Sequence, residues 1–213
     1  MLLHFKGQQL HLHPHKALFW EEQRALLIAD LHLGKAKHFR KSGIAVPADV
    51  GNENWDKLIA LLLDFQPERV WFLGDLFHST YNDAWEELKT LMQQFSSIKF
   101  TLIKGNHDIL KKQKYLEANL EVIDELYEAP FWLTHHPQEE VKMGFYNLAG
   151  HIHPSVRLEG SGKQRLRLPC FYFGKAQAIL PAFGSFTGTA RIQAKIGDQV
   201  FVVLEDQVLE VSG

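Results

Sequence analysis

Five short clusters of Asp, Asn and His residues interrupt the sequence, and each cluster follows an apolar run. The apolar runs span residues 25–29, 70–73, 100–103, 131–134 and 145–149. The clusters that follow them contain Asp30 and His32, Asp75 and His78, Asn106, His107 and Asp108, His135 and His136, and His151 and His153. Carboxylates, amides and imidazoles that occur together without thiolates suit Mn, Fe or Zn. The clusters therefore predict a site for divalent metal ions.

The positions of the clusters predict that they meet in space. Apolar runs of this length are typical of strands that are buried on both faces of a sheet. In sheets with crossover helices, functional side chains gather beyond the carboxyl ends of the strands. Asp75 lies in the second cluster, and its two carboxylate oxygens could bridge two cations.

Each cluster also has an ordinary structural explanation. A lone Asp-x-His or His-x-His pair arises readily by chance, and a buried histidine is more often a hydrogen-bonded core residue than a metal ligand. Asn106 after Gly105 is also typical of a turn, because both residue types tolerate positive φ. The agreement of five clusters in residue type and in position favours metal binding over these separate explanations.

The segments between the clusters indicate an α/β fold. Apolar residues at helical spacing predict two helices, one capped by Asp49 and ending before Pro67, the other capped by Asn82 or Asp83. Alternating strands and helices predict crossover units around a largely parallel sheet. After about residue 120, short strand-like runs separated by Gly and Pro predict a second sheet. We therefore expect two mixed β-sheets packed face to face with flanking helices, in a single domain over residues 1–213.

The composition narrows the class of protein. With 46% hydrophobic and 23% charged residues it is that of an ordinary globular chain, and the formal net charge of -2 gives no bulk reason to expect a nucleic-acid or membrane-surface binder. No leader-like start or bilayer-spanning run is present, which predicts a cytoplasmic protein without a membrane partner. The lone Cys170 excludes an intrachain disulfide and a thiolate zinc site. The oligomeric state stays open.

Three of the twelve histidines alternate near the N-terminus, as His11, His13 and His15. This alternation predicts one face of a short edge strand that ends at Pro14. We interpret these histidines as a solvated strand face rather than as a metal site.

The order of the polar clusters resembles the calcineurin-like metallophosphoesterase superfamily. The motifs that carry the resemblance are Asp30-x-His32, Gly74-Asp75-x-x-His78, Gly105-Asn106-His107-Asp108, His135 and Gly150-His151-x-His153. The superfamily commonly has Asp at the last position of the second motif, where this chain has His78. The resemblance covers most of the chain and implies a hydrolase that cleaves phosphodiester bonds by attack of a metal-activated hydroxide.

The resemblance also implies the ligands of two metal ions. One ion would be bound by Asp30, His32, Asp75 and His153, and the other by Asp75, Asn106, His135 and His151. The ions would lie roughly 3.5 Å apart, as in other two-metal hydrolases. His135 is preferred to His136 because the ligand in the superfamily directly follows the strand. Mn is the expected metal, with Fe and Zn as alternatives.

The catalytic residues implied by this scheme are His107 and Asp108. His107 is not a ligand, so we assign it to stabilising the transition state or protonating the leaving group. Asp108 would orient the His107 ring and keep it charged. Asp108 could instead cap a helix that begins at Ile109, and both roles could hold together. The candidates for substrate binding are Asn106, His78, Lys35, Arg40 and His136. Lys35 and Arg40 belong to a basic segment over residues 35–41, which could hold the phosphates of a polynucleotide or form a solvated loop.

A narrower resemblance rests on longer segments of the chain. Residues 29–35, 38–44, 168–173 and 180–188 are similar to the bacterial ligase-associated metallophosphoesterases, often described as DNA damage response endonucleases and typically encoded beside a DNA ligase and a helicase. This similarity implies a nuclease that acts on DNA in repair and a functional link to a ligase and a helicase. Two other functions stay open, namely hydrolysis of small compounds such as cyclic nucleotides or phosphomonoesters, and a catalytically inert interaction subunit. The complete ligand set argues against the inert subunit.

Overall fold

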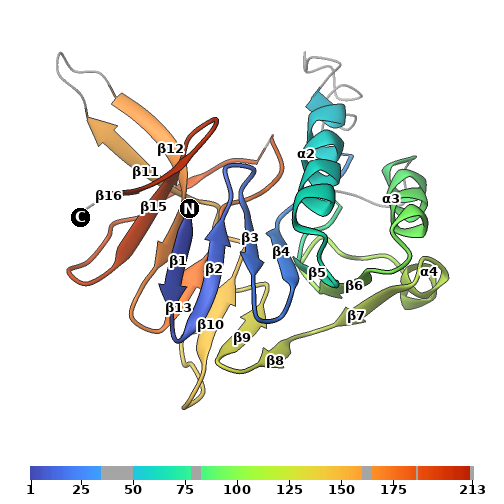
Figure 1. Cartoon of the computed structure of the whole chain (residues 1–213), viewed down its shortest axis with the longest axis horizontal. Coiled ribbons are helices and arrows are strands. Elements are labelled where there is room, and N and C mark those ends of the chain that lie inside the picture. The colour runs from blue at the N-terminus through green and yellow to red at the C-terminus, as the bar shows by residue number, and fades with distance from the viewer. Residues whose placement is uncertain (35–49, 78–82, 160–164, 186, 212–213) are drawn as a thin grey trace.

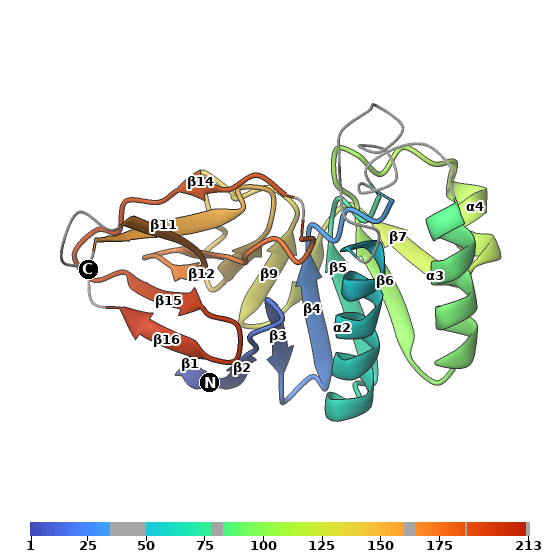
Figure 2. The same cartoon turned by 90° about the horizontal axis from the view of Figure 1, so that it is seen from above.

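Two β-sheets packed face to face form the centre of the computed structural model (Figures 1 and 2). The structure describes residues 1–34, 50–77, 83–159, 165–185 and 187–211. Helices lie against the outer face of one sheet, as Figure 2 shows. The expected architecture of two mixed sheets is therefore confirmed.

The first sheet has seven strands in the order β1-β2-β3-β4-β5-β6-β7. The strands are β1 (Leu2–Phe5), β2 (Gln8–Leu12), β3 (Ala17–Trp20), β4 (Ala25–Ala29), β5 (Arg69–Leu73), β6 (Lys99–Ile103) and β7 (Leu120–Ile123). Strands β1 to β4 pair antiparallel, and β4 to β7 pair parallel. The parallel half places the carboxyl ends of β4, β5 and β6 side by side at one edge.

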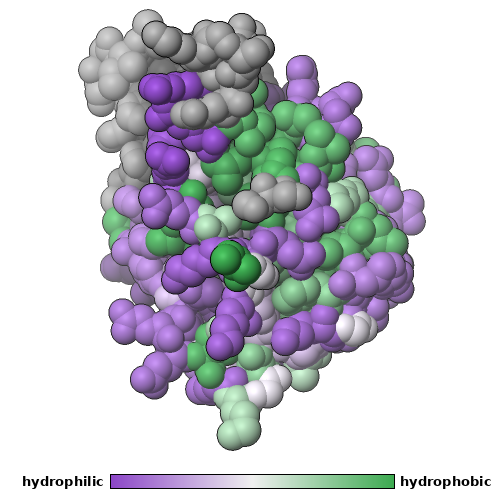
Figure 3. Space-filling model, turned by 90° about the vertical axis from the view of Figure 1, so that its left-hand side faces the viewer, coloured by the Kyte–Doolittle hydropathy of each residue, from purple (hydrophilic) through white to green (hydrophobic). Residues whose placement is uncertain are grey.

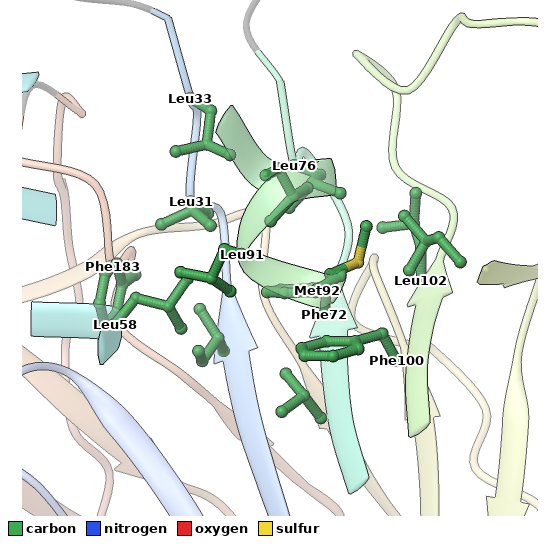
Figure 4. Close-up of a cluster of buried hydrophobic side chains, with 14 of the residues drawn as sticks. Leu31, Leu33, Leu58, Phe72, Leu76, Leu91, Met92, Phe100, Leu102 and Phe183 are labelled. Atoms are coloured by element: carbon green, nitrogen blue, oxygen red, sulfur yellow. The ribbon is translucent and has the colours of Figure 1, made fainter. Parts of the chain in front are cut away.

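Three described helices pack on the first sheet, namely α2 (Val50–Phe65), α3 (Asp83–Gln94) and α4 (Lys112–Glu117). Leu58 of α2, Trp85 of α3 and Tyr115 of α4 belong to one buried cluster with strand residues such as Phe72. Figure 4 shows part of this cluster, in which side chains of α2 and α3 meet those of the strands. The helical spacing predicts Leu63 on the buried face of α2, but Leu63 is exposed and Leu61 is buried in its place.

The second sheet contains nine strands. They are β8 (Leu126–Glu128), β9 (Phe131–Thr134), β10 (Tyr146–Ala149), β11 (Pro154–Glu159), β12 (Arg165–Phe173), β13 (Gln177–Ile179), β14 (Ala190–Arg191), β15 (Gln199–Val203) and β16 (Val208–Val211). Their order is β14-β11-β12-β13-β10-β9-β8, with β15 paired to β12 and β16 paired to β15. Strands β9, β10 and β13 run parallel, so the carboxyl ends of β9 and β10 also lie side by side.

Apolar packing joins the two sheets. Trp20 and Trp71 of the first sheet are buried in the same cluster as Phe131, Phe171 and Phe201 of the second sheet. The ring centroids of Trp20 and Phe131 lie 4.8 Å apart, in an edge-to-face arrangement. Burial of each large apolar side chain stabilises the fold by about 1.5–3 kcal/mol, so this interface fixes the sheets against each other.

The N-terminal histidines differ from the expected edge strand. Strand β2 ends at Leu12 and lies between β1 and β3, so it is not an edge strand. His13 and His15 follow the strand in a turn, where the backbone N–H of His15 donates to Nδ1 of His13 over 3.1 Å. This local hydrogen bond competes with continuation of the strand.

One further expectation is wrong. The helix expected from Ile109 begins at Lys112 with Lys111 at its N-cap, so Asp108 does not cap it. The described flanking helices lie on the first sheet, and the outer face of the second sheet carries a small cluster of Cys170, Val200 and Val202. In the described part of the chain, none of the helices combines the length and the apolar character needed to cross a bilayer.

Candidate metal centre

The predicted metal ligands gather where five strands end. Asp30 follows β4, Asp75 follows β5 after one glycine, and Asn106 follows β6 after two residues. In the second sheet, His135 directly follows β9, and His151 and His153 follow β10. Both sheets therefore contribute to one site, as the positions of the clusters predict.

Aspartate and histidine atoms approach one another closely in this site. The Oδ1 atom of Asp30 lies 3.4 Å from Nε2 of His153, and Oδ2 of Asp75 lies 3.9 Å from Nε2 of His32. The other oxygen of Asp75, Oδ1, lies 3.5 Å from Nε2 of His135. The Asp75 carboxylate thus stands between two histidines, with one oxygen toward each.

The donor atoms form three overlapping groups that could each hold a metal ion. They are Asp30 with His32 and His153, Asp30 with Asp75 and His135, and His135 with His136 and His151. Within each group the ligand atoms lie within 4.8 Å of one another. The groups share Asp30 and His135, so the described donors are continuous across the site.

Hydrogen bonds to backbone carbonyls orient two of the imidazole rings. Nδ1 of His135 donates to the carbonyl of Leu73 over 2.9 Å, and Nδ1 of His153 donates to the carbonyl of Gly188 over 2.8 Å. A carbonyl can only accept, so the proton of each neutral ring lies on Nδ1. Nε2 then presents its lone pair to the aspartates. Metal-ligating histidines have the same outer hydrogen bond.

The buried carboxylate of Asp30 indicates that a cation fits here. Asp30 is completely buried, and its Oδ2 accepts the backbone N–H of His151 over 2.8 Å. Its Oδ1 is also buried and accepts no hydrogen bond from the described residues. A buried carboxylate oxygen without a donor is costly unless a charge or metal compensates it. The residues present therefore fit a divalent metal ion.

Five of the seven predicted ligands have a backbone in the left-handed region. The φ angles are 52° at Asp30, 48° at His32, 49° at Asp75, 66° at His151 and 52° at His153. Each such non-glycine residue costs about 1 kcal/mol or more, and strain of this kind concentrates at functional sites. The two ligands of Asp30-x-His32 thus do not alternate on an extended strand but sit on a tight turn.

Leucines between the ligands anchor these turns in the core. Leu31, Leu33 and Leu76 are almost completely buried in the cluster under the helices, and Figure 4 shows them pointing into it. Backbone hydrogen bonds run from His32 N–H to the Asp75 carbonyl (3.0 Å) and from Leu33 N–H to the Leu76 carbonyl (2.9 Å). The two ligand turns therefore hold each other in place.

Two glycines allow the loops to approach this closely. Gly74 has a φ of 78°, and a Cβ atom built there would lie 2.1 Å from Nδ1 of His135. A Cβ atom on Gly150 would lie 2.6 Å from Oδ2 of Asp30. Any side chain at these positions would push a ligand away, since real Cβ atoms essentially never come within 3.0 Å.

His107 lies at the exposed side of the centre. Its backbone N–H donates to Oδ1 of Asp75 over 2.9 Å, and its Nε2 lies 4.0 Å from Oδ2 of the same residue. The side chain is 47% exposed, which distinguishes it from the buried ligands. The ring can therefore reach a substrate.

Asp108 joins two of the ligand loops. Its Oδ1 accepts the backbone N–H of Leu76 over 2.9 Å, and its Oδ2 accepts that of Gly105 over 2.8 Å. Burial raises the pKa of this carboxyl, and the two backbone N–H groups oppose that effect. Both oxygens of Asp108 thus accept backbone N–H groups, which position the two ligand loops. The expected role of Asp108 in orienting the His107 ring stays a prediction.

We expect His136, next to Pro137, to line the rim of the site, and it is exposed and lies close to the ligands. Its ring centroid is 4.1 Å from that of His151, and its Nε2 lies 2.5 Å from Oδ1 of Asn106. Burial and the neighbouring His135 lower the pKa of His136, and burial followed by His136 and His135 lowers the pKa of His151. Neutral imidazoles are the forms that bind metal. To bind a metal ion, Asn106 would exchange this contact with His136 for the ion.

Three expected substrate-binding residues lie outside the described residues, namely Lys35, Arg40 and His78. Other contributions to the centre have no motif of their own. The carbonyls of Leu73 and Gly188 carry no side-chain signal, because any residue supplies a carbonyl. The three anchoring leucines do leave a signal, since they alternate with the ligands in the sequence.

A family model matches the chain over much of its length. The model describes the calcineurin-like phosphoesterases and matches residues 23–180, a span that contains all seven predicted metal ligands together with His107 and Asp108. The chain belongs to the calcineurin-like phosphoesterase family. Family membership assigns it to the metal-dependent hydrolases of phosphate esters.

Solved structures also resemble this calcineurin-like phosphoesterase. The Pseudomonas putida nuclease MPE has 29% sequence identity and a TM-score of 0.81, and the match covers 99% of each chain. The E. coli phosphoesterase Yfce has 10% identity and a TM-score of 0.46, with 88% of this chain and 97% of that chain covered. A search of curated protein sequences finds no match. The similarity to a nuclease agrees with the narrower resemblance to ligase-associated metallophosphoesterases.

Proposed function

We propose that this protein is a phosphodiesterase that cuts nucleic acid with two divalent metal ions. The observation that carries the proposal is the position of Asp75, whose oxygens face His32 on one side and His135 on the other. A carboxylate in this position is suited to bridge two ions. The similarity to the P. putida nuclease MPE over the whole chain supports a polynucleotide substrate.

The ligands divide naturally between the two ions. One ion would be held by Asp30, His32, Asp75 and His153, and the other by Asp75, Asn106, His135 and His151. Divalent ions bound there would supply Lewis-acid activation of water and neutralise charge on the phosphoryl group. Mn is our first choice, since the donors are nitrogen and oxygen without sulfur.

The residues of the chain itself perform the remaining steps. His107 can donate a proton from Nε2 to the departing oxygen, because its ring is exposed and its backbone is fixed to Asp75. Asn106 and His136 are exposed beside the donors and would contact the phosphate oxygens. The leucine anchors and Asp108 keep the ligand loops fixed, so little reorganisation is needed when substrate binds.

A substrate panel tests the proposal. The purified protein is loaded with Mn, Mg, Zn or Fe and given chromogenic mono- and diesters, cyclic nucleotides, and single- and double-stranded oligonucleotides. We expect diester hydrolysis and oligonucleotide cleavage with Mn, and loss of both in Asp75→Asn. The control variant Glu117→Gln changes an exposed carboxylate on α4 and should retain both activities.

The same panel separates the rival functions. Hydrolysis of cyclic nucleotides or monoesters without oligonucleotide cleavage would replace the nuclease by a small-molecule phosphoesterase. Bound metal without turnover on any substrate would support an inert interaction subunit. The link to a DNA ligase and a helicase stays a prediction, and the neighbouring genes can test it.

A further inference from the structure

A second basic surface lies in the C-terminal half of the chain. Between residues 151 and 197 the sequence has one acidic residue, Glu159, and seven basic residues: Arg157, Lys163, Arg165, Arg167, Lys175, Arg191 and Lys195. The whole chain has a net charge of -2, so this excess of positive charge is local. Four of the arginines lie on the adjacent strands β11, β12 and β14.

The strand registers bring these four arginines to one face. Arg157 is paired with Arg167 across β11 and β12, and Arg165 is paired with Glu159. Arg191 of β14 is paired with Ser155 of β11, two residues before Arg157. Paired residues share a face, and so do residues two apart on a strand. We call Arg157, Arg165, Arg167 and Arg191 the arginine face.

The opposite face of the same strands is apolar. It carries the pairs Val156 with Leu168 and Leu158 with Leu166. In the side view of Figure 3, strongly hydrophilic side chains gather on one side of the upper part of the molecule and hydrophobic ones on the other, in agreement with this alternation. The arginines thus belong to one side of the sheet and are not scattered over its surface.

The charge arrangement on the arginine face suits an anionic ligand. Arg157 and Arg167 lie directly opposite each other, and like charges in this position destabilise a sheet. An anion beside this pair would interact favourably with both guanidinium groups. Arg165, Arg167 and Arg191 are exposed, whereas Arg157 is partly buried. Guanidinium groups bind phosphate through two parallel N–H donors, which makes phosphate a matching ligand.

The arginine face begins at the metal centre. His153, a predicted metal ligand, directly precedes β11, and its carbonyl accepts the backbone N–H of Ala190, the residue before Arg191, over 3.0 Å. Arg157 follows His153 by four residues, which corresponds to about 13 Å along a strand. Successive phosphates of one duplex strand advance by about 3.4 Å along the helix axis, so this length spans about four phosphates.

We propose that the arginine face binds the phosphodiester backbone of a nucleic-acid strand beside the bond that is cut at the metal centre. The proposal rests on the proposed nuclease function and adds where the strand lies. It predicts that the face contributes to long substrates and not to small diesters, because a small diester does not reach beyond His153.

A triple variant tests the arginine face. Arg165→Gln, Arg167→Gln and Arg191→Gln remove three exposed charges, and the partly buried Arg157 is left in place to protect folding. The readout is the ratio of kcat/KM for a 20-nucleotide substrate to kcat/KM for a chromogenic diester. We expect this ratio to fall about tenfold or more at low salt, because each lost phosphate contact weakens binding and reduces its salt dependence. The diester rate also reports whether the variant folds.

Matched controls separate charge from position. Lys89→Gln, Lys99→Gln and Lys114→Gln remove the same charge from α3, β6 and α4, and the ratio should stay within about twofold of the parent value. Replacement of the three arginines by lysine keeps the charge and should restore most of the ratio. Equal ratios in the Arg→Gln triple variant and in the Lys→Gln control would overturn the role of the arginine face and would leave the proposed function standing. Absence of oligonucleotide cleavage in the parent protein, with diester hydrolysis retained, would instead overturn the proposed function.

Binding without cleavage gives an independent readout. A fluorescent oligonucleotide is titrated with the protein in a chelator, and the parent should bind it more tightly than the arginine triple variant. Vesicles with anionic lipids are titrated in parallel. Loss of vesicle binding with unchanged oligonucleotide binding in the arginine triple variant would assign the face to a membrane surface and overturn the proposal.

Discussion

His107 differs from the predicted imidazole ligands in the exposure of its ring and in the hydrogen bond of its backbone. Its ring is 47% exposed, while its backbone N–H is held by Oδ1 of Asp75. A residue in this position can contact substrate without contributing to metal affinity. Removal of its ring should therefore affect chemistry more than metal binding.

We predict that His107→Ala lowers kcat for a chromogenic diester by about 10²–10⁴-fold, the usual contribution of a general acid. Metal content, measured by elemental analysis after dialysis, should stay close to that of the parent protein. Diesters with a good leaving group should lose less than those with a poor one, since they need less protonation. An unchanged kcat on every diester would remove His107 from catalysis.

His13 is a titratable residue that the metal centre does not use. Burial and the neighbouring His15 lower its pKa to about 4, and its Nδ1 must be unprotonated to accept the His15 N–H. The unfolded chain has the ordinary pKa of 6.5, so between pH 6.5 and 4 the unfolded state binds more protons than the folded state. The contribution of His13 to stability is therefore full above pH 6.5 and is lost as the pH falls toward 4.

We predict that His13→Asn reduces this acid sensitivity, because the Asn side-chain oxygen accepts the same hydrogen bond without titrating. The difference in unfolding free energy between pH 7 and pH 5 should be smaller in the variant than in the parent protein by on the order of 1 kcal/mol. This value includes a reduction for solvent screening, because the ring is partly exposed. Urea denaturation in the presence of a chelator measures the unfolding free energy without a contribution from bound metal. An equal pH dependence in both proteins would contradict the assignment.

Residue types predicted the members of the centre but not their contacts. Asp30, His32 and His135 could be predicted because charged and imidazole side chains that directly follow buried apolar strands are candidates for a functional site. The approach of His136 to His151 depends on how β9 and β10 pair, and the motif order alone places His136 at the rim. The roles of these residues in metal binding stay predictions.

At the scale of elements, the ligand turns act as a connected unit. Asp108 accepts backbone N–H groups from the loop after β5 and the loop after β6 at once. Loss of either bond leaves a buried N–H without an acceptor, which costs about 1–3 kcal/mol. The geometry of Asp75 and Asn106 should then relax.

We predict that Asp108→Asn weakens metal binding by about 10–100-fold, as changes in groups that orient metal ligands usually do. An amide retains one acceptor oxygen, so Asp108→Ala should weaken binding further. Metal affinity is measured by competition with a chromogenic chelator, and kcat is measured at saturating metal. Full kcat at saturating metal would support a positioning role, and a large loss of kcat with normal metal affinity would support the expected catalytic role.

Most elements near the centre could be predicted because their strands are short, apolar and buried on both faces. Strands β4, β5, β6, β9 and β10 begin and end within a residue of the apolar runs. Strand β11 could not be predicted because it begins at Pro154 and alternates polar with apolar residues in a partly exposed hairpin. The arginine face could not be predicted either, because its residues lie on three strands and only the strand register brings them together.

At the scale of the whole molecule, the centre lies across the junction of the two sheets. The first sheet provides Asp30 and Asp75, and the second provides His135, His151 and His153. A metal ion bound to both sets would connect the sheets at one end of their apolar interface. Metal binding should therefore be coupled to the stability of the entire fold and not only of the loops.

We predict that Mn raises the Tm of the protein and that a chelator lowers it. A ligand at 100 times its Kd stabilises the folded state by about 2.7 kcal/mol, which corresponds to a shift of about 5–10 °C for a chain of this size. Asp75→Asn should abolish most of this shift because it removes the carboxylate between the two groups of histidines. The exposed-carboxylate control Glu117→Gln should show the full shift. A Tm that does not respond to Mn or to chelator in the parent protein would mean that the donors of the two sheets do not hold a common metal centre.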